Sequence, residues 1–233
     1  MTTFDQVLGL GDDALVAAQR LAQWCARAPE LEEDVALANI ALDQLGVARL
    51  LLTYAGELEG AGRDEDALAY WRTDREFRNV LLVELPDRDF AVLMAKLLFL
   101  SAFQRLRYES LAAGHDERLA GIAAKAVKES AYHLDHSALW TVRLGDGTEL
   151  SHSRMQDAVD EVWPYTHELV DTAPSLGPAW LSTVDDVLKE ATLCRPEDDW
   201  KPDGGRAGQH TEALSFLLAE MQVLHRAHPG ARW

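Results

Sequence analysis

Apolar side chains recur every three or four residues along almost every long segment of this chain, and no alternation typical of β-strands persists anywhere. The stripe formed by Leu10, Ala14, Ala17 and Leu21 is one example, and the stripe through residues 214–224 is another. This period places the apolar side chains on one face of an α-helix, and that face then has to be buried. The pattern therefore predicts an all-α fold.

Capping residues and helix breakers divide the chain into seven expected helices. Asp12 and Asp13 are placed to begin the first helix, and Pro29 to end it. The middle of the second helix, residues 36–45, is apolar on nearly every side, which predicts burial all round. Pro164 should bend the fifth helix. The third long helix should start after Asp87 or Asp89 and run to 113. The other expected ranges are 12–28, 31–59, 117–144, 153–171, 178–193 and 211–227, with short helical pieces at 66–71 and 74–82.

The 233 residues fit a single domain, 1–233, in which four long helices form a bundle with three shorter helices around it. The 39 acidic and 22 basic residues give a net charge of −17, which excludes a general affinity for nucleic acid. The most apolar stretch, residues 90–103, is about half a membrane span long and contains Lys96. There is no secretory signal pattern and no disulfide framework. We therefore expect a cytoplasmic protein that does not enter a membrane.

Helical bundles of this size often hold two iron ions, which require one Glu from each of two helices and a Glu-x-x-His motif from each of the other two. The chain contains one such motif, Glu149 to His152, and it is expected to straddle a turn. In the second helix, Asp43 is followed by glycine at the histidine position, Gly46. The sequence therefore lacks a complete set of di-iron ligands.

The fourth helix keeps part of the same pattern. His133 is present, but Ser130 stands where the glutamate of the motif belongs. Glu129 and His136 share the face of His133 because they lie one turn to either side of it. Asp43, Glu129, His133 and His136 are thus either a residual metal site or, as we favour, a buried hydrogen-bonded network that fills a former cavity.

Three arginines, Arg72, Arg75 and Arg78, form the densest basic feature of this acidic chain. They are candidates for contact with an anionic ligand or with carboxylates of a partner protein. An equally good interpretation is that they form ion pairs on a solvated helix, and such pairs contribute little stability. Their partners would then be Asp66, Asp74 and Glu76.

Six segments together resemble the structural C subunit of the multicomponent phenylacetyl-CoA epoxidases, and the resemblance extends over nearly the whole chain. Any one segment alone would be weak evidence, but their order and combination are specific. The segments are residues 37–49, 74–84, 125–133, 208–212, 218–222 and 229–233.

This resemblance implies a ferritin-like fold and a division of labour between subunits. The catalytic A subunit would hold the two irons and the CoA thioester, while a reductase would supply electrons from NADPH through flavin and an iron–sulfur centre. The subunit that this chain resembles has no cofactor and keeps the catalytic subunit folded. The all-round apolar second helix and the seven tryptophans predict a large surface buried against another bundle. We therefore expect a homodimer when the chain is alone, and a heteromer with the catalytic subunit plus further oxygenase subunits. Gly46 and Ser130 depart from the metal-binding pattern where a structural subunit would.

Two other functions stay open from the residues alone. One is an autonomous metal-dependent oxygenase that uses the reduced ligand set of the second and fourth helices. The other is a binding module for CoA esters that uses the arginine cluster, helped by Lys125 or Lys128, without chemistry of its own.

Overall fold

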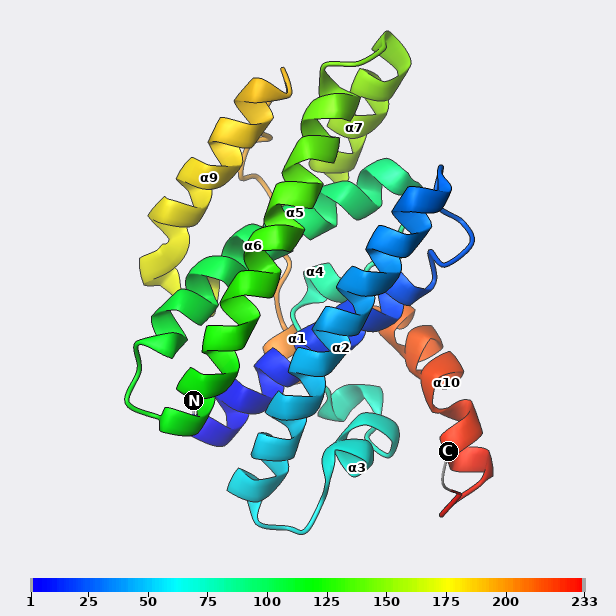
Figure 1. Cartoon of the computed structure of the whole chain (residues 1–233), viewed down its shortest axis with the longest axis vertical. Coiled ribbons are helices and arrows are strands. Elements are labelled where there is room, and N and C mark those ends of the chain that lie inside the picture. The colour runs from blue at the N-terminus through cyan, green and yellow to red at the C-terminus, as the bar shows by residue number, and fades with distance from the viewer. Residues whose placement is uncertain (1, 232–233) are drawn as a thin grey trace. The chain divides into compact units, whose positions relative to one another are not determined.

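The computed structural model describes residues 2–231, and these residues form helices, turns and loops without a β-strand (Figure 1). The all-α prediction is therefore confirmed. Arg232 and Trp233, the end of the last segment of the resemblance, lie outside the described residues. The helices fall into two compact units. The terminal unit comprises residues 2–86 and 203–231, and the middle unit comprises residues 87–202.

In the terminal unit, two long helices, α1 and α2, pack side by side as a hairpin (Figure 1). Shorter elements complete the unit: α3 packs against α2 and α10, and α4 packs against α1 and α10. The bounds are α1 Thr3–Ala22, α2 Leu31–Glu59, α3 Glu65–Tyr70, η1 Asp74–Glu76, α4 Leu81–Glu84, η4 Gly205–Ala207 and α10 Glu212–Ala227, where η marks a short 3-10 helix.

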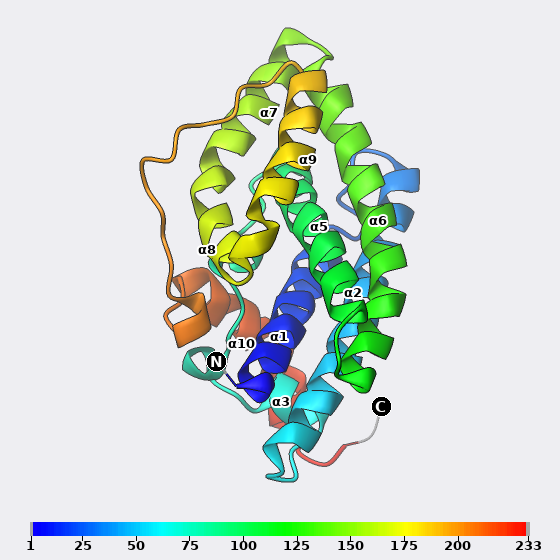
Figure 2. The same ribbon diagram turned by 90° about the vertical axis from the view of Figure 1, so that its left-hand side faces the viewer.

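In the middle unit, α5 and α6 form a second long hairpin, and α7, α8 and α9 pack against α5 (Figure 2). Residues 91–104 of α5 are all buried. The bounds are α5 Phe90–Ala112, α6 Glu117–Gly145, α7 Glu149–Val162, η2 Trp163–Tyr165, α8 Thr166–Asp171, η3 Pro174–Leu176 and α9 Gly177–Glu190.

The long helices α2, α5 and α6 begin and end within one residue of the expected positions because their ends carry clear signals. The Asp89 side chain accepts a hydrogen bond from the backbone N–H of Val92 at 3.0 Å, and Asp116 accepts one from Leu119 at 2.9 Å. Gly60, with φ +69°, closes α2 in the left-handed conformation that glycine adopts readily.

The expected start of the first helix at Asp12 is wrong. α1 begins at Thr3, where Thr2 and Asp5 form a capping box, and it ends at Ala22 instead of residue 28. Asp12 and Asp13 lie inside the helix and are buried. Their carboxylates bond to other parts of the terminal unit, so they do not cap a helix.

Pro164 divides the expected fifth helix into α7 and α8, separated by the 3-10 turn η2. Proline has no N–H to donate, so the α-helical hydrogen bonding is interrupted there. The helix also begins earlier than expected. Glu149 and His152 lie in the first turn of α7, which corrects the expectation that they straddle a turn, and His152 Nδ1 lies 2.7 Å from the carbonyl oxygen of Gly145.

Candidate functional site

The two α2 residues of the degenerate metal motif lie in the terminal unit. Asp43 and Gly46 are both half-buried. A Cβ atom added to Gly46 would meet no atom within 4 Å, so packing does not require glycine at this position. The space leaves room for a side chain where this sequence has none.

The remaining residues of the motif lie on α6 in the middle unit. Ser130 and His133 are buried, whereas Glu129 and His136 are half-buried. Lys125 reaches Glu129 at 3.4 Å, and the hydroxyl of Ser137 donates to the carbonyl oxygen of His133 at 2.9 Å. This face of α6 thus carries one carboxylate and two imidazoles, each with contacts of its own.

This donor set does not fit a di-iron centre. Two irons need about four carboxylates, whereas the motif positions of α2 and α6 supply only Asp43 and Glu129. Among residues 2–231, no group of three or more His, Cys, Asp or Glu side chains is arranged to hold a metal ion. No step of a metal-dependent reaction is therefore assigned to these residues.

The three arginines do not form one basic cluster. Arg72 is buried, Arg75 is exposed, and Arg78 is half-buried with its guanidinium donating to the carbonyl oxygens of Arg75 and Phe77. The prediction of surface ion pairs is also wrong for Arg72, since its guanidinium is only 2% exposed. Arg72 is not available to an external anion.

Arg72 belongs to a buried ionic network that the sequence did not reveal. Its guanidinium donates to both carboxylate oxygens of Asp12, at 2.9 and 2.5 Å, and to the carbonyl oxygen of Leu68 at 2.5 Å. The Asp12 carboxylate also accepts the backbone N–H of Arg78. The guanidinium lies over the ring of Phe77 at 4.2 Å. Asp12 therefore fastens α1 to the segment between α3 and α4.

Asp13 makes the corresponding link to the C-terminal part of the terminal unit. Arg206 donates to its two carboxylate oxygens at 3.1 and 2.5 Å, and the backbone N–H of Val80 donates at 2.8 Å. Burial raises the pKa of Asp13 to about 6, against the opposing effect of Arg206. Two adjacent aspartates in an otherwise apolar helix were the one sequence signal for this network.

The largest departure from the sequence prediction concerns α2, which is buried on one side only. Leu37, Ile40 and Leu51 belong to the core. The opposite side carries apolar residues in contact with solvent, and this α2 apolar face comprises Leu31, Val35, Leu42, Leu45 and Leu50, which are 73%, 55%, 64%, 37% and 42% exposed. A helix that is apolar all round usually has both sides covered, so the open side of α2 is a candidate binding surface.

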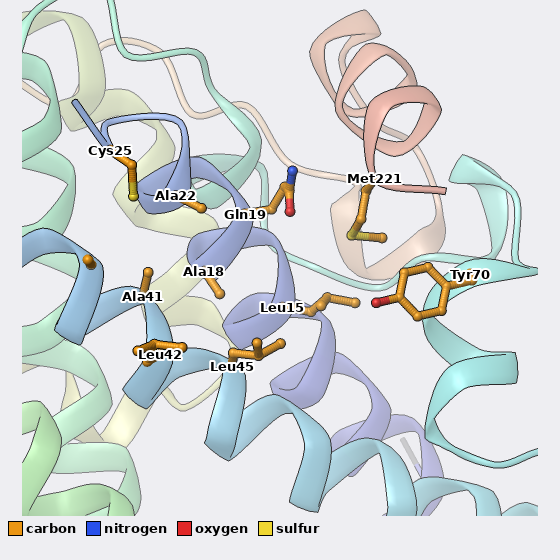
Figure 3. A pocket seen from close by; sticks show the side chains of 11 residues that line it. Leu15, Ala18, Gln19, Ala22, Cys25, Ala41, Leu42, Leu45, Tyr70 and Met221 are labelled. Atoms are coloured by element: carbon orange, nitrogen blue, oxygen red, sulfur yellow. The ribbon is translucent and has the colours of Figure 1, made fainter. Parts of the chain in front are cut away.

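A groove of about 350 Å³ runs beside this face within the terminal unit (Figure 3). Leu42 and Leu45 of α2 form one wall and Leu15 of α1 forms another, while Tyr70 and Met221 close the far edge. The lining is mostly apolar, and Gln19 is its principal polar side chain. Such a groove suits apolar side chains of a binding partner better than a charged ligand.

By length and composition alone, α2 is also apolar enough to cross a membrane, although 44% of its most apolar window is buried inside the structure. Core helices of soluble proteins meet the same criterion. The four acidic residues at the start of α2, Glu30, Glu32, Glu33 and Asp34, suit the positive end of a helix dipole.

Comparison with known proteins relates the whole chain to one family. The model of the family described as phenylacetic acid catabolic protein matches residues 1–233. The C subunit of the 1,2-phenylacetyl-CoA epoxidase of Escherichia coli (strain K12) is 45% identical over an alignment of 241 positions that spans 97% of this chain and 97% of the relative. The chain therefore belongs to the phenylacetic acid catabolic protein family.

Proposed function

We propose that this member of the family is the structural, non-catalytic C subunit of a phenylacetyl-CoA epoxidase in phenylacetate degradation, where it keeps the catalytic subunit folded and assembled. The observation that carries the proposal is the α2 apolar face, an exposed row of leucine and valine side chains beside an apolar groove. Similarity to the E. coli relative supplies the identity of the complex.

The proposal places the cofactors outside this chain. The two irons belong to the catalytic subunit, and flavin, the iron–sulfur centre and NADPH act through the reductase. The incomplete donor set of α2 and α6 supports this division. The chain acts as one ferritin-like domain, 1–233, and the family match over all 233 residues supports a single functional unit. The proposed location is the cytoplasm.

In this proposal the α2 apolar face is covered by the catalytic subunit. Obligate interfaces are more apolar than ordinary surfaces and commonly bury more than about 2,000 Å² in total. When the catalytic subunit is missing, a second copy of this chain covers the face instead, which gives the expected homodimer. Further oxygenase subunits bind elsewhere.

Introducing charge into the surface tests this interface. Replacing Leu42 and Leu45 together with lysine should weaken association with the catalytic subunit at least roughly tenfold, because two charges would then be desolvated in the interface. Leu150→Lys on α7 is the matched control, since Leu150 is 62% exposed and lies outside the face. Sedimentation velocity of this chain, alone and mixed with its partner, gives the readout. Equal association of the double variant and the control would contradict the proposed interface.

Metal and thioester measurements distinguish the other two functions. Two irons bound per isolated chain would establish an autonomous oxygenase and overturn the structural role. Saturable binding of phenylacetyl-CoA to the isolated chain in a calorimetric titration would instead indicate a CoA-ester module. We expect neither result, because the ligand set is incomplete and Arg72 is already neutralised by Asp12.

A further inference from the structure

A buried histidine in the terminal unit lies between two hydrogen-bond acceptors. His210 Nδ1 is 2.7 Å from Oε2 of Glu84, and Nε2 is 3.1 Å from the carbonyl oxygen of Phe77. The side chain is 3% exposed. A neutral imidazole has a single N–H and can satisfy only one of two acceptors, whereas the imidazolium has two N–H groups. The charged form of His210 satisfies both acceptors at once, so the geometry favours the imidazolium.

Glu84 provides the matching negative charge. Its side chain is fully buried and accepts three hydrogen bonds: from the amide of Asn79 at 2.8 Å, and from the backbone N–H and hydroxyl of Thr211 at 2.6 and 2.9 Å. Oε2 also faces His210 Nδ1. Several donors around one carboxyl group favour a carboxylate, and a buried carboxylate in turn needs a cation beside it. The contacts on both side chains thus favour an ion pair.

The charges around the pair come from each neighbouring element. Asp74 on η1 interacts electrostatically with His210. Arg20 on α1 donates to the backbone carbonyl of Glu84 at 3.1 and 2.5 Å. Arg75 and Glu212 line a polar pocket of about 440 Å³ that also contains His210 and Asp74. Glu84 is the carboxylate in direct contact with the imidazole, so it dominates the interaction.

The pair is located where the C-terminal segment joins the rest of the terminal unit. Thr211 precedes α10 directly, and Glu84 takes the place of a side-chain cap for that helix, since it accepts the Thr211 N–H. α10 contributes Met221 to the apolar groove and Gln222 to the core, where the Gln222 amide donates to the carbonyl oxygens of Ala69 and Arg72. Loosening of the pair would free the start of a helix that forms one edge of the groove.

We propose that protonated His210 is a pH-sensitive clasp that holds α10 against the terminal unit, and that loss of its proton releases α10 and alters the groove. Without the second proton, one ring nitrogen would present a lone pair to Glu84 or to the carbonyl oxygen of Phe77, and the contact would become repulsive. The stabilising effect is complete below about pH 6.5, where an exposed histidine is also charged, and it is lost as the pH rises and the clasp gives up its proton. This inference does not depend on the proposed function.

Nitrogen chemical shifts of ¹⁵N-histidine-labelled full-length protein test the charge directly. Both ring nitrogens of His210 should have the shifts of an imidazolium at neutral pH. His210→Gln identifies the signal. If the His210 signal is that of a neutral ring at neutral pH, the proposal is overturned, whether or not the variant folds.

Hydrogen exchange measured by mass spectrometry tests the release. After correction for the intrinsic pH dependence, exchange of residues 212–227 should accelerate above neutral pH, by at most about tenfold per pH unit for release of one proton. Exchange of α9 should not change. His210→Gln should exchange quickly at every pH, and His115→Gln, at an exposed position of the middle unit, should behave as wild type. Exchange of α10 that is independent of pH in the wild-type chain would refute the clasp.

Discussion

The terminal and middle units stabilise their interiors in different ways. In the terminal unit, α1 buries Asp12, Asp13 and Arg20 among its apolar residues. In the middle unit, α5 buries a run that is apolar apart from a few polar residues, and two of these bond nearby in the sequence. Lys96 pairs with Asp87 at 2.8 Å, and Ser101 donates to the carbonyl oxygen of Leu97 at 2.5 Å. One interior depends on ion pairs between distant segments, and the other depends on packing.

Aromatic side chains dominate the packing of the middle unit. Trp163 and Trp180 stack at 5.7 Å, and Phe99 meets the Trp163 ring edge-on at 5.6 Å. The indole N–H of Trp180 donates to the carbonyl oxygen of Phe99 at 3.0 Å. These contacts bury large apolar rings while satisfying their single polar group.

The difference follows the course of the chain. The middle unit is one continuous segment, whereas the terminal unit joins two segments separated by that unit. Apolar packing alone discriminates weakly between alternative ways of docking two separate segments. A buried ion pair has specific partners and geometry. We interpret the Asp13–Arg206 pair, which joins the two segments, as fixing how they dock, and the Asp12–Arg72 pair as fixing the register of α1 within the first segment.

The largest expected effect is the loss of the Asp12–Arg72 pair. Arg72→Ala should lower the free energy of unfolding by about 3–5 kcal/mol, because Asp12 would keep a buried charge without its cation. Arg49→Ala is the matched control, since Arg49 pairs with Glu65 but is 67% exposed, and it should change little. Chemical denaturation measures both.

A double variant separates stability from specificity. Asp12→Leu combined with Arg72→Met removes both charges and should recover much of the lost stability. If the double variant is stable but its amide NMR spectrum shows several conformations, the register interpretation is supported. A stable variant with one native-like spectrum would contradict it.

The next effect is the pH response of Asp13. Because burial raises its pKa from 3.8 to about 6, the folded protein binds a proton between these values that the unfolded chain does not. The contribution of Asp13 to stability therefore falls as the pH rises from about 4 to about 6, by at most about 3 kcal/mol. Asp13→Asn should flatten this part of the stability curve. If the curves of stability against pH were parallel for the wild type and Asp13→Asn, the effect of Arg206 on the pKa of Asp13 would outweigh that of burial.

The sequence predicted helix positions well where the ends carry local signals. Asp89 and Asp116 cap α5 and α6, and both helices begin where expected. The prediction that Asp12 and Asp13 also begin a helix was wrong. Their carboxylates instead bind Arg72 and Arg206, which are 60 and 193 residues away. Contacts over such separations depend on tertiary packing, so the partners of these aspartates cannot be identified from local patterns in a single sequence.

The candidate site was predicted only in part. The incomplete ligand set at Gly46 and Ser130 is visible in the sequence itself. The sequence predicted that α2 is buried all round, but it does not show which side is covered by its own chain, because an all-round apolar helix looks the same whether its second side meets its own core or another protein. Leu42 and Leu45 are indistinguishable from core leucines until the fold is known.

A smaller effect is expected in the aromatic core. Trp180→Phe keeps most of the ring but removes the indole N–H, which leaves the buried carbonyl oxygen of Phe99 without that donor. The free energy of unfolding should fall by about 1–3 kcal/mol. Trp200→Phe is the control, because Trp200 is 59% exposed and should tolerate the change. A loss for Trp180→Phe as large as that for Arg72→Ala would remove the proposed contrast between the units.

The smallest effect on stability is expected for Asp198, a partly exposed carboxylate that contacts the aromatic core of the middle unit. The Asp198 carboxylate accepts the indole N–H of Trp163 at 2.9 Å and lies 3.2 Å from Nε2 of His167. The Trp163 hydrogen bond holds the pKa of Asp198 below its usual value, whereas burial lowers the pKa of His167. Asp198→Ala should cost about 0.5–1.5 kcal/mol, the net value of one hydrogen bond, and should lower the pKa of His167 further because a nearby negative charge is lost. Asp198→Asn retains an acceptor for Trp163 and should recover the stability but not the pKa of His167. An NMR titration of His167 in both variants checks this separation, and an unchanged pKa would show that burial alone sets the charge of this histidine.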